Sequence, residues 1–194
     1  MDVRTPTSSS QADDDLLVQG AARADQSAWT VLVERHLSAI VGYAWHVLGD
    51  RAEAEDVAQE TFLRLLGKIE GWRPGGPGLR TWLYRVAINL CIDRRRLRRE
   101  MPLQEMLDLP EGADRQPALD DRLDQRVAVR KALDALPESQ RTAITLVYYQ
   151  GMTNREAAEL LEVSVEAVES LLARARRALR RQLDPVITDL MGVS

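Results

Sequence analysis

Arginine side chains crowd into two short stretches of this 194-residue chain. Residues 94–99 hold five arginines in six positions, and residues 174–181 hold five in eight. A guanidinium group forms a planar fork that matches phosphate oxygens, so such clusters are typical of surfaces that contact nucleic-acid backbones. A solubilising surface is the alternative, but it does not need this density. Because the whole chain carries a net charge of −4, we expect nucleic acid at the arginine clusters and protein partners elsewhere.

Residue types that perform covalent or metal chemistry are sparse. The two histidines, His36 and His46, lie ten positions apart on one predicted helix, without a partner at metal-ligand spacing. The single cysteine, Cys91, falls in an apolar helical pattern and is expected to be a core residue rather than a nucleophile. The glycine-rich stretch 75–78 lacks the Lys-Ser/Thr pair of a phosphate-binding loop. We therefore expect a non-enzymatic protein without a catalytic residue, metal or cofactor.

Two helical patterns joined by a short break must position the second arginine cluster. The first pattern opens at Thr153, which forms a capping box with Glu156. The break falls at residues 162–164, where Ser164 is a suitable N-cap for the second helix. Two helices connected in this way, the second long and basic, predict a helix-turn-helix that places its second helix in the DNA major groove. An ordinary helical hairpin with a solvated arginine face is the alternative.

Helical periodicity of apolar residues also runs through the preceding chain. Asp25 is predicted to cap a helix that Gly49 ends. Asp50 opens the next helix, with Glu53 at the capping-box position, and a further helix begins near Leu79. No segment alternates with the period of a strand, so the sequence predicts an all-α protein.

Proline, glycine and acidic residues interrupt the helical pattern between residues 100 and 118, which predicts a flexible linker between two small helical domains. The first domain is predicted to span 13–99, and the second, with the helix-turn-helix, to span 119–184. Segments 1–12 and 185–194 are predicted to be tails. No apolar run approaches the roughly 20 residues of a membrane helix, and the N-terminus lacks a signal-peptide pattern. We therefore expect a cytoplasmic protein without membrane insertion.

Five sequence features resemble the extracytoplasmic-function sigma factors of bacterial RNA polymerase. Residues 56–62 (DVAQETF) and 79–89 (LRTWLYRVAIN) are similar to domain 2 of that family. Residues 136–141 (LPESQR), residues 149–153 (YQGMT) and the helix-turn-helix are similar to domain 4. The motifs follow the family's order, with the linker between them, and cover nearly the whole chain beyond the N-terminal tail. The resemblance implies core RNA polymerase and promoter DNA as partners.

The resemblance assigns roles to residues of domain 2. The helix that carries Asp56, Gln59 and Glu60 is expected to dock on the clamp helices of the largest polymerase subunit, and these side chains can share one exposed face. The glycine/proline loop and the helix after it are expected to meet the −10 element, where aromatic rings stack on unpaired bases and arginines hold phosphates. The expected −10 residues are Trp72, Arg73, Arg85, Asn89, Arg94, Arg95 and Arg96. Alternatively, Trp72 and Trp82 are core residues.

Domain 4 is expected to read the −35 element. The residues that the resemblance implies are Ser164, Glu166, Glu169, Ser170, Ala173, Arg174, Arg176 and Arg177. Here the chain departs from its family, in which Lys and Arg are common at the positions of Glu169 and Leu171, and Gly at that of Glu162. Glu169 either accepts a hydrogen bond from a cytosine or contributes nothing. Glu162 costs about 1 kcal/mol if its turn is left-handed.

The function implied by the resemblance is that of a sigma factor. Such a protein binds core polymerase, recognises and melts the promoter, and starts transcription, here for a stress or envelope-signal regulon. The family also implies an inhibitory anti-sigma factor, which no residue of the chain identifies. The alternative is a stand-alone helix-turn-helix regulator, which would bind DNA without polymerase. The acidic net charge favours the sigma factor, because it provides little electrostatic affinity for free DNA.

Overall fold

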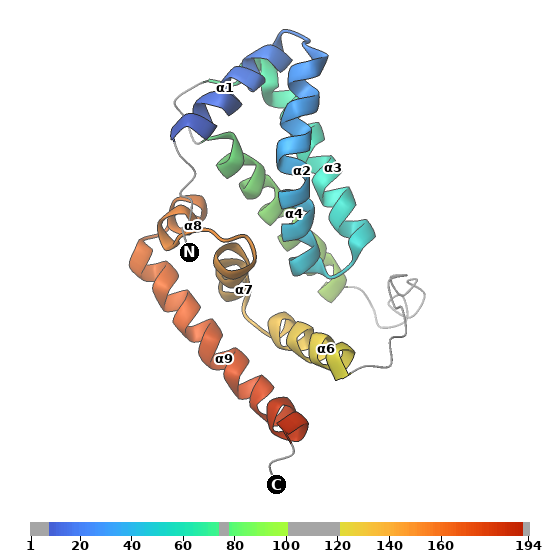
Figure 1. Cartoon of the computed structure of the whole chain (residues 1–194), viewed down its shortest axis with the longest axis vertical. Coiled ribbons are helices and arrows are strands. Elements are labelled where there is room, and N and C mark those ends of the chain that lie inside the picture. The colour runs from blue at the N-terminus through green and yellow to red at the C-terminus, as the bar shows by residue number, and fades with distance from the viewer. Residues whose placement is uncertain (1–7, 74–77, 101–120, 192–194) are drawn as a thin grey trace.

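The computed structural model describes residues 8–73, 78–100 and 121–191, and all of the regular structure in these ranges is helical (Figure 1). The N-terminal half contains α1 (Ser8–Ala22), α2 (Gln26–Leu48), α3 (Arg51–Lys68), the short 3-10 helix η1 (Ile69–Gly71) and α4 (Leu79–Glu100). The C-terminal half contains α6 (Asp121–Asp134), α7 (Glu138–Ile144), the π-helix η2 (Thr145–Tyr149), α8 (Asn154–Leu161) and α9 (Val165–Met191). The predicted all-α fold is confirmed. Within the described ranges, no helix is long and apolar enough to cross a bilayer.

The first and last helices extend beyond the predicted domain limits. α1 begins at Ser8, inside the predicted tail 1–12, because a helix that is already anchored propagates with one hydrogen bond per added residue. α9 continues through Pro185 to Met191 instead of ending at residue 184, although proline has no N–H to donate within a helix. The predicted linker 100–118 lies outside the described residues, apart from Glu100 at the end of α4.

The predicted ends of α2 and the start of α3 are confirmed. The Asp25 carboxylate accepts hydrogen bonds from the backbone N–H groups of Ser27 and Ala28, at 2.9 and 3.2 Å. Gly49 follows α2 with a φ of 74°, a left-handed conformation that glycine adopts without a steric penalty. Asp50 caps α3 by accepting from the N–H of Glu53 at 2.9 Å. These local contacts give the long hairpin of α2 and α3 its two defined ends.

The core of the N-terminal half lies around α2, which packs against α1, α3 and α4. Apolar side chains from these helices are fully buried, and each contributes on the order of 2 kcal/mol through removal from water. The predicted core position Cys91 is among the buried residues, and so is Phe62. Phe62 meets Trp29 edge to face, with ring centroids 6.4 Å apart.

A buried carboxylate fastens α1 to α2. Asp14 lies 2.8 Å from Nη1 of Arg35 and 3.0 Å from Nε2 of His36. Burial raises the pKa of the Asp14 carboxyl, but hydrogen bonds and positive charge from His36 and Arg35 outweigh burial and hold that pKa below its ordinary value. His36 is therefore a buried structural partner of Asp14.

A buried arginine organises the C-terminal half. The Arg141 side chain, 2% exposed, donates from Nε to the carbonyl of Leu133 at 2.9 Å. Its Nη2 donates to the carbonyls of Asp134 and Leu136, at 3.0 and 2.7 Å. These carbonyls lie at the end of α6 and in the turn into α7, where helical donors run out. The Leu133 carbonyl also accepts from the N–H of Leu136 at 3.1 Å, and the guanidinium is the donor to the carbonyls of Asp134 and Leu136.

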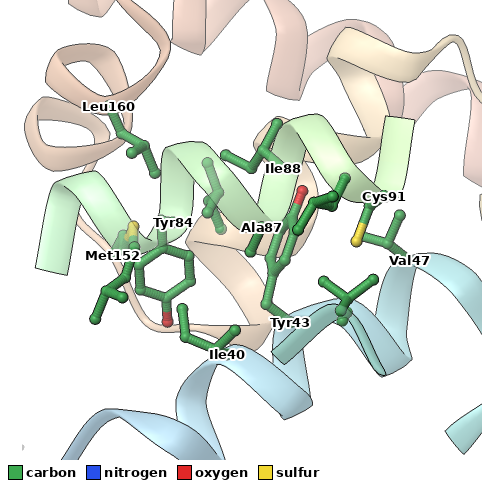
Figure 2. Close-up of a cluster of buried hydrophobic side chains, with 14 of the residues drawn as sticks. Ile40, Tyr43, Val47, Tyr84, Ala87, Ile88, Cys91, Met152 and Leu160 are labelled. Carbon is green, nitrogen blue, oxygen red and sulfur yellow. The ribbon is translucent and has the colours of Figure 1, made fainter. Parts of the chain in front are cut away.

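The two halves share one continuous apolar core (Figure 2). Met152 and Leu160 of the C-terminal half point toward Tyr84 on α4, and Ile40 of α2 lies on the other side of that ring. All four side chains are buried. The Tyr84 hydroxyl donates a hydrogen bond to Oε1 of Gln150 at 2.9 Å. The helix-turn-helix half is therefore packed directly on α2 and α4.

Candidate polymerase and promoter interfaces

The outer face of α3 carries the residues expected to bind polymerase. Asp56 and Gln59 are exposed, and Glu60 is half-buried and forms an ion pair with Arg64 at 2.9 Å. The opposite face of α3 is buried in the core through Val57 and its neighbours. The amphipathic pattern of this helix thus brings all three side chains to solvent on one helix.

An apolar groove lies beside this face, between α2 and α3. Its volume is about 1010 Å³, and Gln59 is part of its lining. Much of the lining is apolar, including Trp29, Val33, Leu37, Trp45, Phe62 and Leu63. Trp45 and Leu63 are about half exposed. An apolar patch of this kind, next to charged residues, is typical of a protein-binding surface.

The turn of the helix-turn-helix is built as the sequence predicts. The Thr153 hydroxyl accepts from the N–H of Glu156 at 3.2 Å, and the Glu156 carboxylate accepts from the N–H of Thr153 at 2.8 Å. Both halves of the predicted capping box are present. Ser164 caps α9 by accepting from the N–H of Ala167 at 3.2 Å. Between the helices, Glu162 has φ 57° and ψ 40°, the left-handed conformation that favours glycine.

α9 has one buried face and one face open to solvent. Val168, Leu172 and Ala175 are buried, and α9 packs on α6, α7 and α8. Of the residues expected to read the −35 element, Ala173 is half-buried and the others are exposed, namely Ser164, Glu166, Glu169, Ser170, Arg174, Arg176 and Arg177. The backbone N–H of Glu166 and the Ser164 hydroxyl lower the pKa of the Glu166 carboxyl. A carboxylate therefore stands at the N-terminal end of α9.

The aromatic residue expected at the −10 element is packed in this conformation. The Trp72 ring meets Trp82 edge to face, with centroids 6.1 Å apart. Its Nε1 donates to Oδ1 of Asp15 at 3.4 Å. Trp72 and Trp82 are both half-buried against the core, whereas the neighbouring Arg73 is exposed. In this conformation Trp72 therefore packs against the core, which was the alternative to a ring free to stack on a base.

Comparison with known proteins gives the same two regions. The family model described as Sigma-70 region 2 matches residues 32–100, and the one described as Sigma-70, region 4 matches residues 126–179. The chain is 33% identical to the ECF RNA polymerase sigma factor SigE of Mycolicibacterium smegmatis, over 84% of this chain and 65% of that relative. It is 31% identical to the ECF RNA polymerase sigma factor SigW of Bacillus subtilis, over 86% and 94%. The structure of CnrH in complex with the cytosolic domain of CnrY matches with a TM-score of 0.66 and 29% identity, over 89% and 98%.

The similarity to SigW decides the family, because it extends over 94% of that relative. This chain belongs to the extracytoplasmic-function sigma factors. The family predicted from the sequence motifs is confirmed. A sigma factor binds core RNA polymerase and promoter DNA to start transcription, and its class is that of transcription regulators rather than enzymes.

The first arginine cluster of the sigma factor is largely engaged within the chain. Nη1 of Arg94 lies 3.6 Å from the Asp56 carboxylate and donates to the carbonyl of Glu53 at 3.3 Å. Nη2 of Arg98 lies 2.7 Å from the Glu53 carboxylate, and its Nη1 donates to the carbonyl of Leu48 at 3.3 Å. The prediction of a free phosphate-binding surface did not include this role. These arginines also fasten α4 to the junction of α2 and α3.

The remaining expected arginines of this cluster differ in their surroundings. Nη1 of Arg95 donates to the carbonyl of Val47 at 2.9 Å and to Oδ1 of Asp134 at 2.7 Å. Asp134 belongs to α6, so Arg95 connects the two halves of the sigma factor. Arg96 is exposed and lies 3.7 Å from the Glu100 carboxylate, within one helix.

The two expected −10 residues in the middle of α4 also have different surroundings. Asn89 is exposed. Arg85 donates to the carbonyls of Glu159 and Leu160, at 3.0 and 3.3 Å, and lies 3.0 Å from the Glu162 carboxylate. This contact was not predicted, because no local pattern connects residues about 75 positions apart. The one feature of the sequence that pointed to this contact was Glu162, for which a left-handed turn was expected to cost free energy.

Proposed function

We propose that the sigma factor divides its work among three helices. α3 binds core polymerase, α4 holds the −10 element and α9 reads the −35 element. The observation that carries this proposal is that each half of the chain presents an exposed polar helix face within the region matched by its sigma-family model. In the sequence, residues 101–120 connect the two halves that carry these faces.

The polymerase site proposed on α3 consists of Asp56, Gln59 and Glu60. The apolar groove between α2 and α3 supports this assignment, because Gln59 belongs to both surfaces. A helical partner on α3 would cover the exposed Leu63 and also contact the polar residues of the proposed site on the same helix. An apolar centre with a charged margin is the usual anatomy of such an interface.

The residues of the −10 site proposed on and next to α4 form two groups, those exposed to solvent and those that contact other parts of the chain. Asn89, Arg73 and Arg96 are exposed and can meet DNA without rearrangement. The others have protein partners in this conformation, so their proposed DNA contacts require those partners to be exchanged, namely Trp72, Arg85, Arg94 and Arg95. Aromatic stacking suits unpaired bases, and guanidinium groups suit phosphates.

The −35 site proposed on α9 faces solvent along the helix. Arg174, Arg176 and Arg177 are assigned to phosphates, which adds affinity without base specificity. Residues nearer the helix start are assigned to bases, namely Ser164, Glu166, Glu169, Ser170 and Ala173. A glutamate at such a position accepts a hydrogen bond from cytosine N4, whereas it repels phosphates.

We further propose an anti-sigma factor as the regulatory partner and a stress or envelope-signal regulon as the target. The support is that CnrH, which resembles this chain over 89% of its length, was solved with a second protein, the cytosolic domain of CnrY. Because a sigma factor acts on polymerase and DNA, we assign this chain to the cytoplasm. We assign it no catalytic step.

The proposal is tested by capture of core RNA polymerase on the purified chain and by run-off transcription of genomic fragments. We expect stoichiometric capture and new transcript starts that polymerase alone does not produce. Tight binding to duplex DNA without polymerase, together with no capture, would instead identify a stand-alone regulator. Mapping the new starts gives the promoter sequence, which then serves to test the α9 residues individually.

A further inference from the structure

The first helix of the helix-turn-helix is fastened to α4 at both of its ends. Near the start of α8, the Glu156 carboxylate accepts a hydrogen bond from Nη1 of Arg80 at 3.2 Å. At the other end, Arg85 donates to the carbonyls of Glu159 and Leu160. Carbonyls in the last turn of a helix have no intrahelical donor, and they carry the negative end of the helix dipole. The cation of Arg85 thus occupies a site that favours it.

Apolar packing supports this pair of polar contacts. Leu160 and Met152 are buried between the halves, next to Tyr84, which lies between Arg80 and Arg85 on α4 (Figure 2). The guanidinium of Arg80 lies 5.7 Å from the centroid of the Tyr84 ring. α8 therefore covers one stretch of α4 with an apolar centre and a charged group on each side.

Glu162 extends the contact beyond the end of α8. Its backbone is left-handed, with φ 57°, a conformation that costs free energy for any residue except glycine. In this conformation its carboxylate lies 3.0 Å from Nη1 of Arg85. Arg85 thereby gains a third acceptor, which a glycine would not supply. The strained residue is explained by its contact with the other half of the chain.

The helix that faces DNA at the other promoter element takes no part in this contact. The capping residue of α9 and its exposed polar and basic residues lie on the side away from its packing on α6, α7 and α8. The closed arrangement therefore has different effects on the accessibility of the two proposed DNA sites. It engages Arg85 of the −10 site and leaves the face of α9 in solvent.

We propose that the contact of Arg80, Tyr84 and Arg85 with Gln150, Glu156 and the 159–162 segment is a latch that withholds Arg85 from promoter DNA until the halves separate. Glu162 strengthens this latch in this particular chain. The −35 helix stays accessible while the latch is closed, so contact with −35 DNA does not require opening and contact of Arg85 with −10 DNA does. This inference rests on the proposed −10 role of Arg85.

Opening of the latch is measured by energy transfer between dyes on the free full-length chain. Dyes are attached to cysteines introduced as Leu66→Cys on α3 and Arg181→Cys on α9, both at exposed positions. The native Cys91 does not compete for the dyes, because it is buried and its pKa is raised to about 12. The ratio of low-transfer to high-transfer molecules reports the ratio of open to closed chains.

Glu162→Gln and Glu159→Gln form a matched pair, because each removes one negative charge and only the first side chain contacts Arg85. Glu159 forms its ion pair with Arg155 instead, on the exposed side of α8. Glu162 is 72% exposed, so its loss should raise the open-to-closed ratio only about two- to fivefold. Arg85→Met removes two further hydrogen bonds of a charged group and should raise the ratio about tenfold or more. Glu159→Gln should leave it unchanged.

Glu162→Gly separates the latch from general stability. It should open the chain as much as Glu162→Gln while giving a higher thermal midpoint than Glu162→Gln, because glycine relieves the left-handed backbone. Unchanged energy transfer in Glu162→Gln and Arg85→Met would overturn the latch. Equal opening by Glu159→Gln would also overturn it. These readouts need neither polymerase nor promoter, so a failure of the proposed function in transcription assays remains a separate result.

Discussion

At the scale of single residues, Asp56 is the most informative position on the proposed polymerase face. Its carboxylate is exposed and its one described ion pair, with Arg94 at 3.6 Å, is long and solvent-accessible. Such a pair contributes little to stability. We expect Asp56→Arg to weaken binding to core polymerase roughly tenfold or more, because it places a like charge against a partner that suits an acid. Titration of labelled polymerase with each variant measures the affinity.

Glu70→Arg is the matched control for Asp56→Arg. Glu70 is an exposed glutamate in η1, beyond the end of α3, and the substitution changes the net charge by the same amount. It should leave the affinity for polymerase and the thermal midpoint as they are. Equal weakening by both variants would mean that net charge, rather than the α3 face, governs the interaction.

Asn89 gives the corresponding test on α4. Its side chain is exposed between the buried residues Ile88 and Leu90, so its removal leaves the core intact. We expect Asn89→Ala to lower open-complex formation roughly fivefold or more, through loss of hydrogen bonds to an unpaired base, and to leave polymerase affinity unchanged. Permanganate footprinting of the melted promoter gives the first quantity, and polymerase titration gives the second. Adding Trp72→Ala should deepen the defect, although this change also removes packing against Trp82.

Local residue patterns were sufficient to predict several of these positions and insufficient for others. Thr153 with Glu156, and Gly49, act on backbone groups within a few residues, so their roles follow from short motifs. Arg95 was predicted only as a phosphate contact, because its partner Asp134 lies on another helix, 39 residues away. Long flexible side chains choose partners through tertiary contacts, which short motifs do not encode.

At the scale of elements, the end of α6 depends on one buried cation. Arg141 donates to three carbonyls where α6 stops, and Arg141→Met removes all three of these hydrogen bonds. We expect this change to lower the free energy of unfolding by about 3 kcal/mol, and Arg141→Lys to lose most of the same stability, because an ammonium lacks the planar fork. Urea denaturation measures both. Arg155→Met, on the exposed face of α8, should change stability by less than about 0.5 kcal/mol.

The C-terminal end of α2 makes a second prediction about an element. A Cβ on Gly49 would lie 0.7 Å from Nη2 of Arg130, a residue of α6, whereas a Cβ on Gly151 meets nothing within 4 Å. Both glycines have positive φ, so alanine strains the backbone at either site by about 1 kcal/mol. Gly49→Ala must additionally displace the arginine from the negative end of α2, which adds about 0.3–1 kcal/mol. Thermal denaturation of the two variants isolates this difference, and equal costs would show that Arg130 contributes nothing there.

The elements themselves were largely predictable, because each has its own apolar stripe and cap. α2, α3, α4 and the helix-turn-helix follow from spacing alone. The π-helix Thr145–Tyr149 does not, because its wide turn depends on how it meets α2. Tyr149 stacks there on His46, with ring centroids 4.0 Å apart.

At the scale of the whole molecule, we expect this histidine beside Tyr149 to make closure sensitive to acid. Burial, followed by the charge of Arg130, lowers the pKa of His46. A lowered pKa means that the closed chain prefers neutral His46. The stabilisation that His46 gives to the closed arrangement is therefore complete above about pH 6.5, and it is lost as the pH falls through the lowered pKa of His46. The open fraction in the energy-transfer assay should therefore rise between about pH 7 and pH 5. His46→Phe keeps a ring against Tyr149 and should flatten the rise; an identical pH profile would exclude His46 as its source.

The closed arrangement of the two halves was the part of the molecule that the sequence analysis did not predict. A composition that indicates a linker also predicts independent domains, yet Met152 and Leu160 complete a core that begins on α2 and α4. Small apolar residues on a short helix such as α8 indicate packing without indicating the partner. Contact between the two halves depends on tertiary packing, which the pattern of a single helix does not encode.

The placement of Cys91 bears on how the folded chain responds to oxidants. Its side chain is enclosed between α2 and α4, next to Val47, and burial raises its pKa to about 12 (Figure 2). With that pKa, roughly one sulfhydryl in 10⁵ is ionised at neutral pH, and peroxide or disulfide reagents react with the ionised form. We therefore expect Cys91 to react slowly with oxidants while the chain is folded.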